Sequence, residues 1–178
     1  MIKTICIYCA SSSAISPQYF EDAKRIAKII VDRQIITVYG GGSSGLMGCI
    51  ADEVIKRQGE IIGIMPNFMK AIEWDHKGVY NFHFVEDMAA RKKKFIDSSD
   101  ALLALPGGSG TIEELMEAIT LKRLKLHNLP IFILNSGGYY DPLIEMLNKT
   151  IEEKFMNGSD KNLWTVINEP DDLIFYLD

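Results

Sequence analysis

The feature that most constrains the fold is a repeated alternation of short apolar runs with longer amphipathic segments. Several runs are continuously apolar and rich in Ile, Val and Leu, as expected of strands buried on both faces of a parallel sheet. Seven strands are predicted, at Thr4–Cys9, Ile35–Tyr39, Ile61–Met65, Asn81–Val85, Ala101–Leu105, Ile131–Leu134 and Leu163–Ile167. Six helices are predicted, at Pro17–Arg33, Leu46–Gln58, Asp87–Ser98, Thr111–Leu126, Pro142–Met156 and Pro170–Leu177. This order predicts an α/β fold.

Length and composition favour a single domain that covers residues 1–178. We expect a Rossmann-like architecture, with a doubly wound, mostly parallel sheet and helices on both faces. A net charge of −5 disfavours nucleic acid as a partner, and no apolar run is long enough for a membrane span. Three cysteines and a strand-like N-terminus in place of a signal peptide predict a cytoplasmic protein.

Three strand-to-helix turns carry residues suited to ligand binding. In a doubly wound sheet, ligands bind beyond the carboxyl ends of the strands, where the strand order reverses. The turns at Ala10–Ser13, Gly40–Gly45 and Pro106–Gly110 are predicted to lie at that edge. The longest irregular segment, Pro66–Gly78, is long enough to indicate a functional loop.

The turn after the fifth predicted strand has the composition of a phosphate-binding loop. Glycines at positions 107, 108 and 110 permit positive φ angles and close approach of a ligand. Successive amides in such a turn form an anion-binding nest, and a helix starting near Thr111 adds free N–H groups and the positive end of its dipole. The loop therefore predicts a site for a monophosphate that requires neither metal nor cofactor.

Glu114 has two interpretations. The pattern Thr111-x-x-Glu114 fits a capping box, in which the glutamate reaches back to the start of the helix, and the bare pattern favours this interpretation. Alternatively, a phosphate on the loop would leave Glu114 about 4.5 Å further along the helix axis, a distance on the scale of a ribose ring. A carboxylate there is suited to stabilise charge at the anomeric carbon, to capture that carbon, or to activate water.

The chain also resembles a known family over nearly its whole length. The run Pro106–Glu114 matches the signature PGGxGTxxE of the LOG ("Lonely Guy") family, the cytokinin riboside 5'-monophosphate phosphoribohydrolases, which are often labelled lysine decarboxylases. Further matching motifs are Tyr39-Gly40-Gly41-Gly42, Gly45-Leu46-Met47-Gly48, Met88-x-x-Arg91-Lys92 and Asn135-x-x-Gly138-Tyr139-Tyr140. The resemblance implies hydrolysis of AMP, or of N6-modified AMP, to free base and ribose 5-phosphate.

The resemblance also implies which residues form the site. Arg91 and Glu114 correspond to the catalytic pair of the family. The implied nucleotide contacts are Glu73, Lys92, Gly107, Gly108, Ser109, Gly110, Thr111, Ile112, Glu113 and Thr120. A homodimer is implied as well, with the site at or near the subunit interface. The segment Leu121–His127 departs from the family pattern in its added charge, which leaves the base preference open.

Arg91 begins a run of four basic residues, and such a run is usually a solvated helix face. We expect Met88 and Phe95 to bury one face of this helix and to leave some of the basic side chains outside. The chemistry nevertheless makes a guanidinium useful, because it can bind phosphate or ribose hydroxyls and orient a carboxylate. It would also lower the pKa of Glu114 and keep that carboxylate ionised.

Two further motifs are weaker. Gly40-x-Gly42-x-x-Gly45 satisfies a dinucleotide-binding pattern but follows the second strand rather than the first, so it indicates close backbone approach to the ligand or to a neighbouring loop. Cys6-x-x-Cys9 resembles a redox or zinc motif, yet its spacing on a strand places the two side chains on opposite faces. Buried cysteines that act as small hydrophobic residues are the better interpretation, and no metal site is expected.

Two competing functions remain open. A non-catalytic carrier of a nucleotide or of molybdenum cofactor would keep the glycine loops and would need neither Arg91 nor Glu114. A pyridoxal-phosphate-dependent lysine decarboxylase would need a lysine that forms a Schiff base, and the sequence pattern identifies none.

Overall fold

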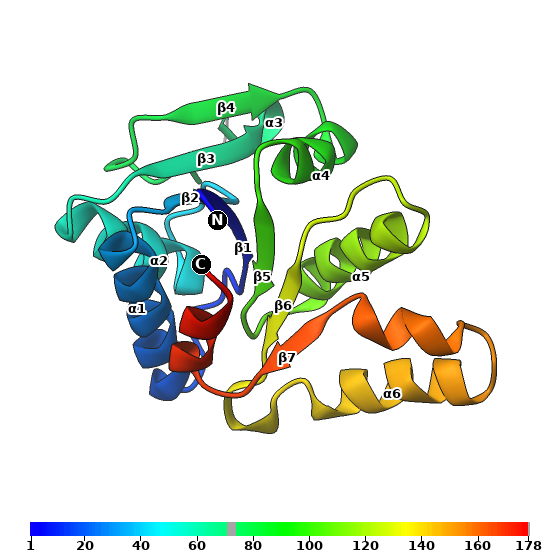
Figure 1. Cartoon of the computed structure of the whole chain (residues 1–178). Helices are drawn as coiled ribbons and strands as arrows, with labels where there is room; N and C mark the ends of the chain where they lie inside the picture. The colour runs from blue at the N-terminus through cyan, green and yellow to red at the C-terminus, as the bar shows by residue number, and fades with distance from the viewer. Residues whose placement is uncertain (71–73, 178) are drawn as a thin grey trace.

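The computed structural model describes residues 1–70 and 74–177. Its centre is a seven-stranded sheet in the order β4-β3-β2-β1-β5-β6-β7, in which every strand pairing is parallel (Figure 1). The predicted doubly wound α/β fold is therefore confirmed. The strands are β1 (Thr4–Tyr8), β2 (Ile36–Tyr39), β3 (Ile61–Pro66), β4 (Phe82–Val85), β5 (Ala101–Ala104), β6 (Ile131–Leu134) and β7 (Thr165–Ile167).

Helices connect successive strands and cover both faces of the sheet (Figure 1). The α-helices are α1 (Pro17–Asp32), α2 (Gly45–Lys56), α3 (Asn67–Lys70), α4 (Met88–Asp97), α5 (Ser109–Arg123) and α6 (Asp141–Glu152). The 3-10 helices are η1 (Ser136–Gly138), η2 (Gly158–Asn162) and η3 (Pro170–Tyr176). Two predictions need correction, because the expected irregular segment begins with α3 and the expected last α-helix is the 3-10 helix η3.

The apolar core forms two layers, one on each face of the sheet. One layer packs α1, α2 and η3 against the strands and contains Ile26, Val54 and Leu173. The other packs α4, α5 and α6 against the opposite face. Cys6 belongs to the second layer and Cys9 to the first, which confirms that the two thiols lie on opposite faces. Burial raises the pKa of both thiols, so they act as small apolar groups.

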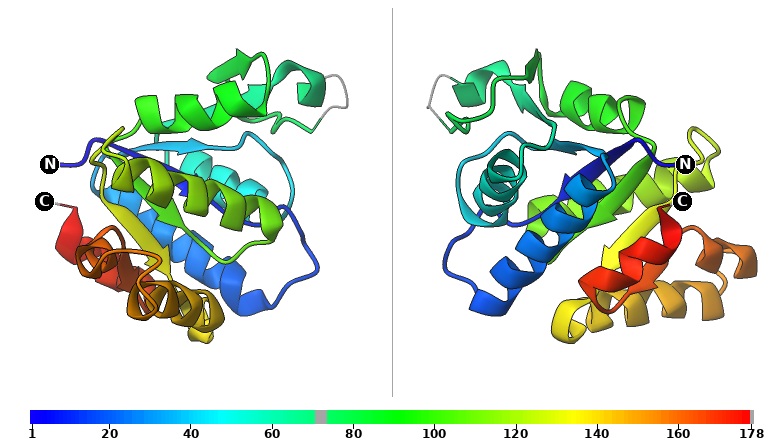
Figure 2. Two further views of the ribbon diagram at one scale, coloured as in Figure 1. Left: turned by 90° about the vertical axis from the view of Figure 1, so that its right-hand side faces the viewer. Right: turned by 60° about the vertical axis from the view of Figure 1, so that its left-hand side comes forward.

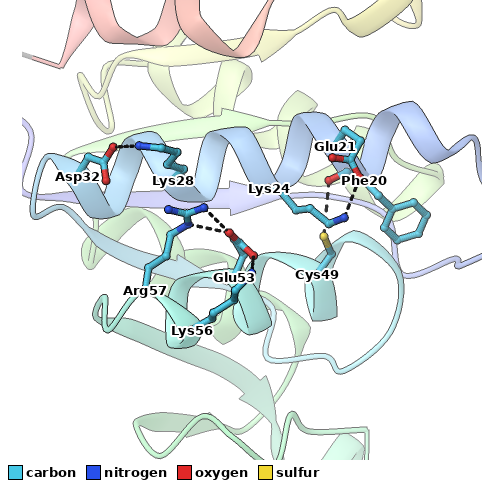
Figure 3. Close-up of polar contacts among 9 residues, drawn as sticks. All are labelled: Phe20, Glu21, Lys24, Lys28, Asp32, Cys49, Glu53, Lys56 and Arg57. Atoms are coloured by element: carbon cyan, nitrogen blue, oxygen red, sulfur yellow. Dashed lines mark hydrogen bonds and ion pairs between the residues drawn. The ribbon is translucent and has the colours of Figure 1, made fainter.

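Helices α1 and α2 lie side by side on the first face, with η3 next to α1 (Figure 2). Polar side chains pair along each helix, as Glu53 Oε1 on α2 does with Nε of Arg57, the C-cap residue of that helix, at 2.7 Å (Figure 3). Cys49 is only half buried, and its thiol donates to the carbonyl of Phe20 across the helix pair at 3.7 Å. None of the helices in the described ranges has the length and apolarity needed to span a membrane.

Strand order reverses between β1 and β5. β1 is followed by α1 and leads to β2 on one side, whereas β5 and β6 continue the sheet on the other side. The loops that leave the carboxyl ends of β1 and β5 consequently diverge and form a crevice between them. Ala10 and Pro106, one from each loop, are joined by a backbone hydrogen bond of 3.3 Å at its base.

Candidate active site

A cavity of about 560 Å³ opens at the carboxyl ends of β1, β2 and β5. The loop after β1 contributes Ser11, and the glycine loop after β2 contributes Gly40, Gly42 and two serines. The loop after β5 and the first turn of α5 form the opposite wall. The three turns that the sequence identified as candidate ligand-binding segments therefore meet at one cavity.

The N-terminus of α5 presents free amides to this cavity. Gly108 is the N-cap residue and no side chain caps the helix. The first amide with a backbone acceptor is that of Ile112, which donates to the Gly108 carbonyl at 3.1 Å. Within the described part of the chain, the N–H groups of Ser109, Gly110 and Thr111 have no acceptor, although these three residues line the cavity. These amides and the helix dipole form an anion-binding site.

The N-terminus of α2 lies against the same cavity, but its first amides already have hydrogen-bond acceptors within the protein. The amides of Leu46 and Met47 donate to the carbonyl of Ala10 at 2.9 and 3.4 Å, and the amide of Gly45 donates to Ser13 Oγ at 3.2 Å. A phosphate cannot bind these donors without breaking existing hydrogen bonds. The glycine pattern after β2 therefore serves close approach to the neighbouring loop rather than binding of a dinucleotide.

The glycines of the two loops differ in backbone conformation. Positive φ angles occur at Gly41 and Gly45, not at Gly107, Gly108 or Gly110, so the expectation of positive φ in the phosphate loop is wrong. A Cβ at Gly107 would lie 2.2 Å from the hydroxyl oxygen of Thr111, whereas Cβ atoms at Gly108 and Gly110 would meet nothing within 4 Å. The last two glycines therefore keep space open in front of the free amides.

Arg91, on α4, is buried rather than solvated, with 8% of its surface exposed. Its Nε donates to the carbonyl of Ile64 at 3.1 Å, and one terminal nitrogen donates to the carbonyl of Gly40 at 3.3 Å. The other terminal nitrogen lies 2.8 Å from Oε1 of Glu114. A side chain at position 40 would overlap the guanidinium, since its Cβ would lie 2.2 Å from Nη2. These contacts engage three of the five N–H groups of Arg91, one of them with the carboxylate of Glu114, and Arg91 also lines the cavity.

Glu114 does not form the capping box that the bare sequence pattern favoured. Helix α5 starts at Ser109, so Thr111 is already its third residue, and Glu114 lies one turn deeper with Oε1 bound to Arg91. Among the described residues, no group hydrogen-bonds its second oxygen, Oε2. Burial raises the pKa of Glu114 and outweighs the opposing effect of Arg91. Arg91 does lower the pKa of Glu114, as expected, but the expectation of a net lowering is wrong.

The remaining predicted contacts divide into three groups. Glu113 lines the cavity and pairs with Lys92, which also lies 2.7 Å from Glu117, so Lys92 bridges α4 to α5 beside the cavity. Ile112 packs into the apolar core, and Thr120 is exposed three turns along α5, away from the cavity of its own chain. Glu73 falls outside the described residues.

Sequence reasoning missed the apolar wall of the cavity. Four methionines and a tryptophan form this wall, namely Met47, Met65, Met69, Met88 and Trp74. Met88 was predicted to be buried with Phe95 but is 36% exposed and faces the cavity. The methionine content of the chain is the sequence feature that could have indicated this wall, since methionine packs well against irregular or variable surfaces.

The motif Asn135-x-x-Gly138-Tyr139-Tyr140 supports the phosphate loop from the outside. The hydroxyl of Tyr139 donates to the carbonyl of Gly107 at 2.6 Å, and the hydroxyl of Tyr140 donates to the carbonyl of Leu105 at 2.7 Å. Asn135 fixes the turn that carries both tyrosines, because its Oδ1 accepts from the backbone N–H of Tyr140 at 2.7 Å. These contacts hold the loop in the conformation that presents its amides.

We expect the Tyr139→Phe variant to weaken phosphate binding without unfolding the protein. Loss of the hydroxyl leaves the Gly107 carbonyl without this donor and removes a hydrogen bond worth about 1 kcal/mol, which predicts a KM for a nucleoside monophosphate raised about five-fold. Steady-state kinetics measure this change. An unchanged KM would show that the loop does not depend on Tyr139.

The fold and the cavity define a class of protein, an α/β protein with free helix N-terminal amides and a buried guanidinium–carboxylate pair at one cavity. A family model described as possible lysine decarboxylase matches residues 47–177 of this chain. The chain therefore belongs to that family, and its predicted resemblance to the LOG proteins is confirmed by curated relatives.

Two of these relatives are plant proteins. One is a probable cytokinin riboside 5'-monophosphate phosphoribohydrolase of Oryza sativa subsp. japonica, 35% identical over 173 residues, or 97% of this chain and 75% of the relative. The other is a cytokinin riboside 5'-monophosphate phosphoribohydrolase of Arabidopsis thaliana, 39% identical over 155 residues, or 87% and 71% of the two chains.

Solved structures share the fold at lower sequence identity. The molybdenum cofactor binding protein of Rippkaea orientalis superimposes with a TM-score of 0.74 at 20% identity, covering 99% of this chain and 95% of that one. The molybdenum cofactor carrier protein of Chlamydomonas reinhardtii gives a TM-score of 0.72 at 21% identity, covering 99% and 96%. At this level of identity the similarity concerns the fold alone.

Proposed function

We propose that the protein hydrolyses the N-glycosidic bond of AMP and of N6-modified AMP, releasing the free base and ribose 5-phosphate. The observation that carries this proposal is the placement of Glu114, bound to Arg91 and one helical turn beyond the free amides at the start of α5. The curated relatives, which are named phosphoribohydrolases of cytokinin riboside 5'-monophosphate, support the same reaction.

The geometry suits a nucleotide lying with its phosphate at the start of α5. The amides of residues 109–111 would bind the phosphate oxygens, and the Thr111 hydroxyl adds a donor at the same place. Glu114 then lies about 4.5 Å along the helix, beside the ribose. The apolar wall formed by the four methionines and Trp74 is suited to a planar base and its substituents.

In this arrangement Glu114 acts as a general base. As the bond between C1' and the base breaks, its electron pair moves to the base nitrogen and positive charge develops on the ribose. Water attacks C1' and its proton passes to Glu114. The departing base takes up a proton from solvent and Glu114 releases its own to solvent, so that AMP and water give adenine and ribose 5-phosphate. The raised pKa of Glu114 makes it a stronger base than an exposed carboxylate.

The competing functions account for fewer of the observations. A carrier has no use for a buried carboxylate with a free oxygen beside a phosphate site, and the solved carriers support the fold only. A pyridoxal-phosphate-dependent lysine decarboxylase needs a lysine in the cavity. Among the described residues that line the cavity, none is a lysine.

We further propose that the protein is a cytoplasmic homodimer. The three cysteines are free, as suits a reducing compartment. Leu124 and Leu126, which follow the C-terminus of α5, are 58% and 69% exposed and offer apolar surface to a second copy. Thr120 is exposed on the same helix, which is compatible with a contact to nucleotide in a neighbouring subunit.

The Gly108→Ala variant tests where the phosphate binds. The new Cβ meets nothing in the protein, so we expect an unchanged melting temperature. The same Cβ projects into the space through which a phosphate reaches the amides, so KM for AMP should rise at least about ten-fold. Gly158→Ala is the matched control, because position 158 is equally open and lies far from the cavity. Equal KM values for the two variants would place the phosphate elsewhere.

A further inference from the structure

The chain that follows residue 73 runs along the glycine loop after β2. Asp75 and Gly42 form an antiparallel bridge. The amide of Ser43 donates to the carbonyl of Trp74 at 3.1 Å, and the amide of His76 donates to the carbonyl of Gly41 at 3.0 Å. This short ladder joins one wall of the cavity to a loop that also contributes to the cavity.

The imidazole of His76 fastens the end of this ladder to α2. Its Nδ1 accepts from the amide of Gly78 at 3.1 Å, and its Nε2 lies 3.1 Å from Oδ1 of Asp52. Because Nδ1 accepts a hydrogen bond, Nε2 carries the proton and donates to the carboxylate. The His76 side chain is only 12% exposed, although Asp52 is 76% exposed. The ring therefore connects the chain around residues 76–78 to α2 and is itself largely buried.

Trp74 lies two residues before His76, on the same ladder. Its side chain lines the cavity but is 55% exposed, so packing alone holds it weakly. Among the described residues, no hydrogen bond or ring contact fixes the indole. The backbone of Trp74 and of the residues that follow it therefore decides where the indole lies.

We propose that His76 is a positioning residue that holds Trp74 at the base side of the cavity. This inference rests on the proposed function for the identity of the ligand. The anchor orders the chain before the nucleotide binds, so that the indole presents its face to the planar base at a smaller entropic cost. His76 thereby governs affinity for the nucleotide and leaves the step at Glu114 nearly unaffected.

The His76 ring makes two contacts, one to the Gly78 amide and one to Asp52, which form the two arms of the anchor. Three variants separate these two arms. His76→Ala removes both arms. His76→Asn keeps the contact to Gly78, because an asparagine Oδ1 accepts the N–H two residues on, but it is too short to reach Asp52. Asp52→Ala removes only the second arm, at an exposed position where a folding defect is not expected. His83→Ala is the matched control, since His83 lies on β4 and its side chain does not line the cavity.

The kinetic readout is the division of the effect between KM and kcat for AMP. We expect His76→Ala to raise KM about ten-fold, and His76→Asn and Asp52→Ala to raise it about three-fold each, with kcat within about two-fold of wild type. The double variant Asp52→Ala/His76→Asn should be no worse than either single variant, because both remove the same contact. In a Trp74→Ala background, His76→Ala should change KM less than about two-fold.

Among the kinetic results for these variants, three would overturn the inference. They are a loss of kcat with KM unchanged, an equal effect of His76→Ala with and without Trp74, or an equal effect of His83→Ala. Dissociation constants for AMP, measured by calorimetry on the same variants, keep this test separate from the proposed function. A wild-type protein that binds AMP without hydrolysing it would contradict the hydrolase, while the same ten-fold loss of affinity in His76→Ala would still support the anchor. A wild-type protein that does not bind AMP would contradict both.

Discussion

Replacing Glu114 with glutamine is expected to lower kcat for AMP by about 10²- to 10⁴-fold, with little change in KM. The amide keeps the size of the carboxylate and can still accept the hydrogen bond from Arg91, so the cavity retains its shape. It cannot take the proton from water, so the barrier rises while ground-state binding persists. Steady-state kinetics with detection of free adenine measure both parameters.

The adjacent glutamate provides the matched control. Glu113 also lines the cavity, but it is exposed and pairs with Lys92 at the surface. We therefore expect Glu113→Gln to retain turnover within about three-fold, because a surface ion pair contributes little. Full turnover by Glu114→Gln, or an equal loss in the two variants, would remove Glu114 from the chemistry.

The Arg91→Lys variant is expected to have the second-largest effect, lowering kcat about 10- to 100-fold. Lysine keeps the positive charge but cannot reproduce the planar set of donors that binds Ile64, Gly40 and Glu114 together. The carboxylate then loses its fixed orientation and part of its neutralising partner. Its position relative to the ribose becomes variable, and the reaction slows.

The same variant has a predicted pH signature. Burial already raises the pKa of Glu114, and Arg91 opposes this effect. Weakening the contact to the guanidinium therefore raises that pKa further. A general base works only when ionised, so the acid limb of the kcat profile should move to higher pH in Arg91→Lys. Lys93→Ala, on the same basic run but at an exposed side chain, should leave the limb in place. A limb that is unmoved or displaced to lower pH in Arg91→Lys would contradict this role of Arg91.

Much of the fold follows from local patterns in the sequence. Continuous apolar runs such as Ala101–Ala104 and Ile131–Leu134 are buried on both faces, and this environment occurs in parallel sheets covered by helices. The phosphate loop was predictable for a similar reason, because glycines between a strand and a helix place free amides at the carboxyl edge of the sheet. Both features depend mainly on residues close together in sequence.

The environment of Arg91 was not predictable from its neighbours. Its sequence context is a basic run of the kind that usually faces solvent, yet its partners come from β3, the glycine loop after β2 and α5. The need for glycine at position 40 was not predictable for the same reason, since the space beside it is filled by the side chain of a residue 51 positions away. Contacts between segments far apart in sequence determine the surroundings of both residues. Of the sequence features, only the family motifs indicated that Arg91 belongs to the site.

The direction of the pKa shift at Glu114 could not be predicted for a related reason. Pairing with Arg91 lowers the pKa, whereas burial raises it, and the balance depends on how completely the surrounding elements exclude water. The start of α5 also mattered. A difference of two residues, Ser109 in place of Thr111, converts an apparent capping box into a carboxylate that reaches across to α4.

The central claim is that Glu114 and Arg91 cleave the bond between ribose and base while the start of α5 holds the phosphate. The most direct test is to incubate the purified protein with AMP and to identify the products by chromatography and mass spectrometry. The structure predicts adenine and ribose 5-phosphate in equal amounts. Adenosine with inorganic phosphate, or bound AMP that is never cleaved, would contradict the claim.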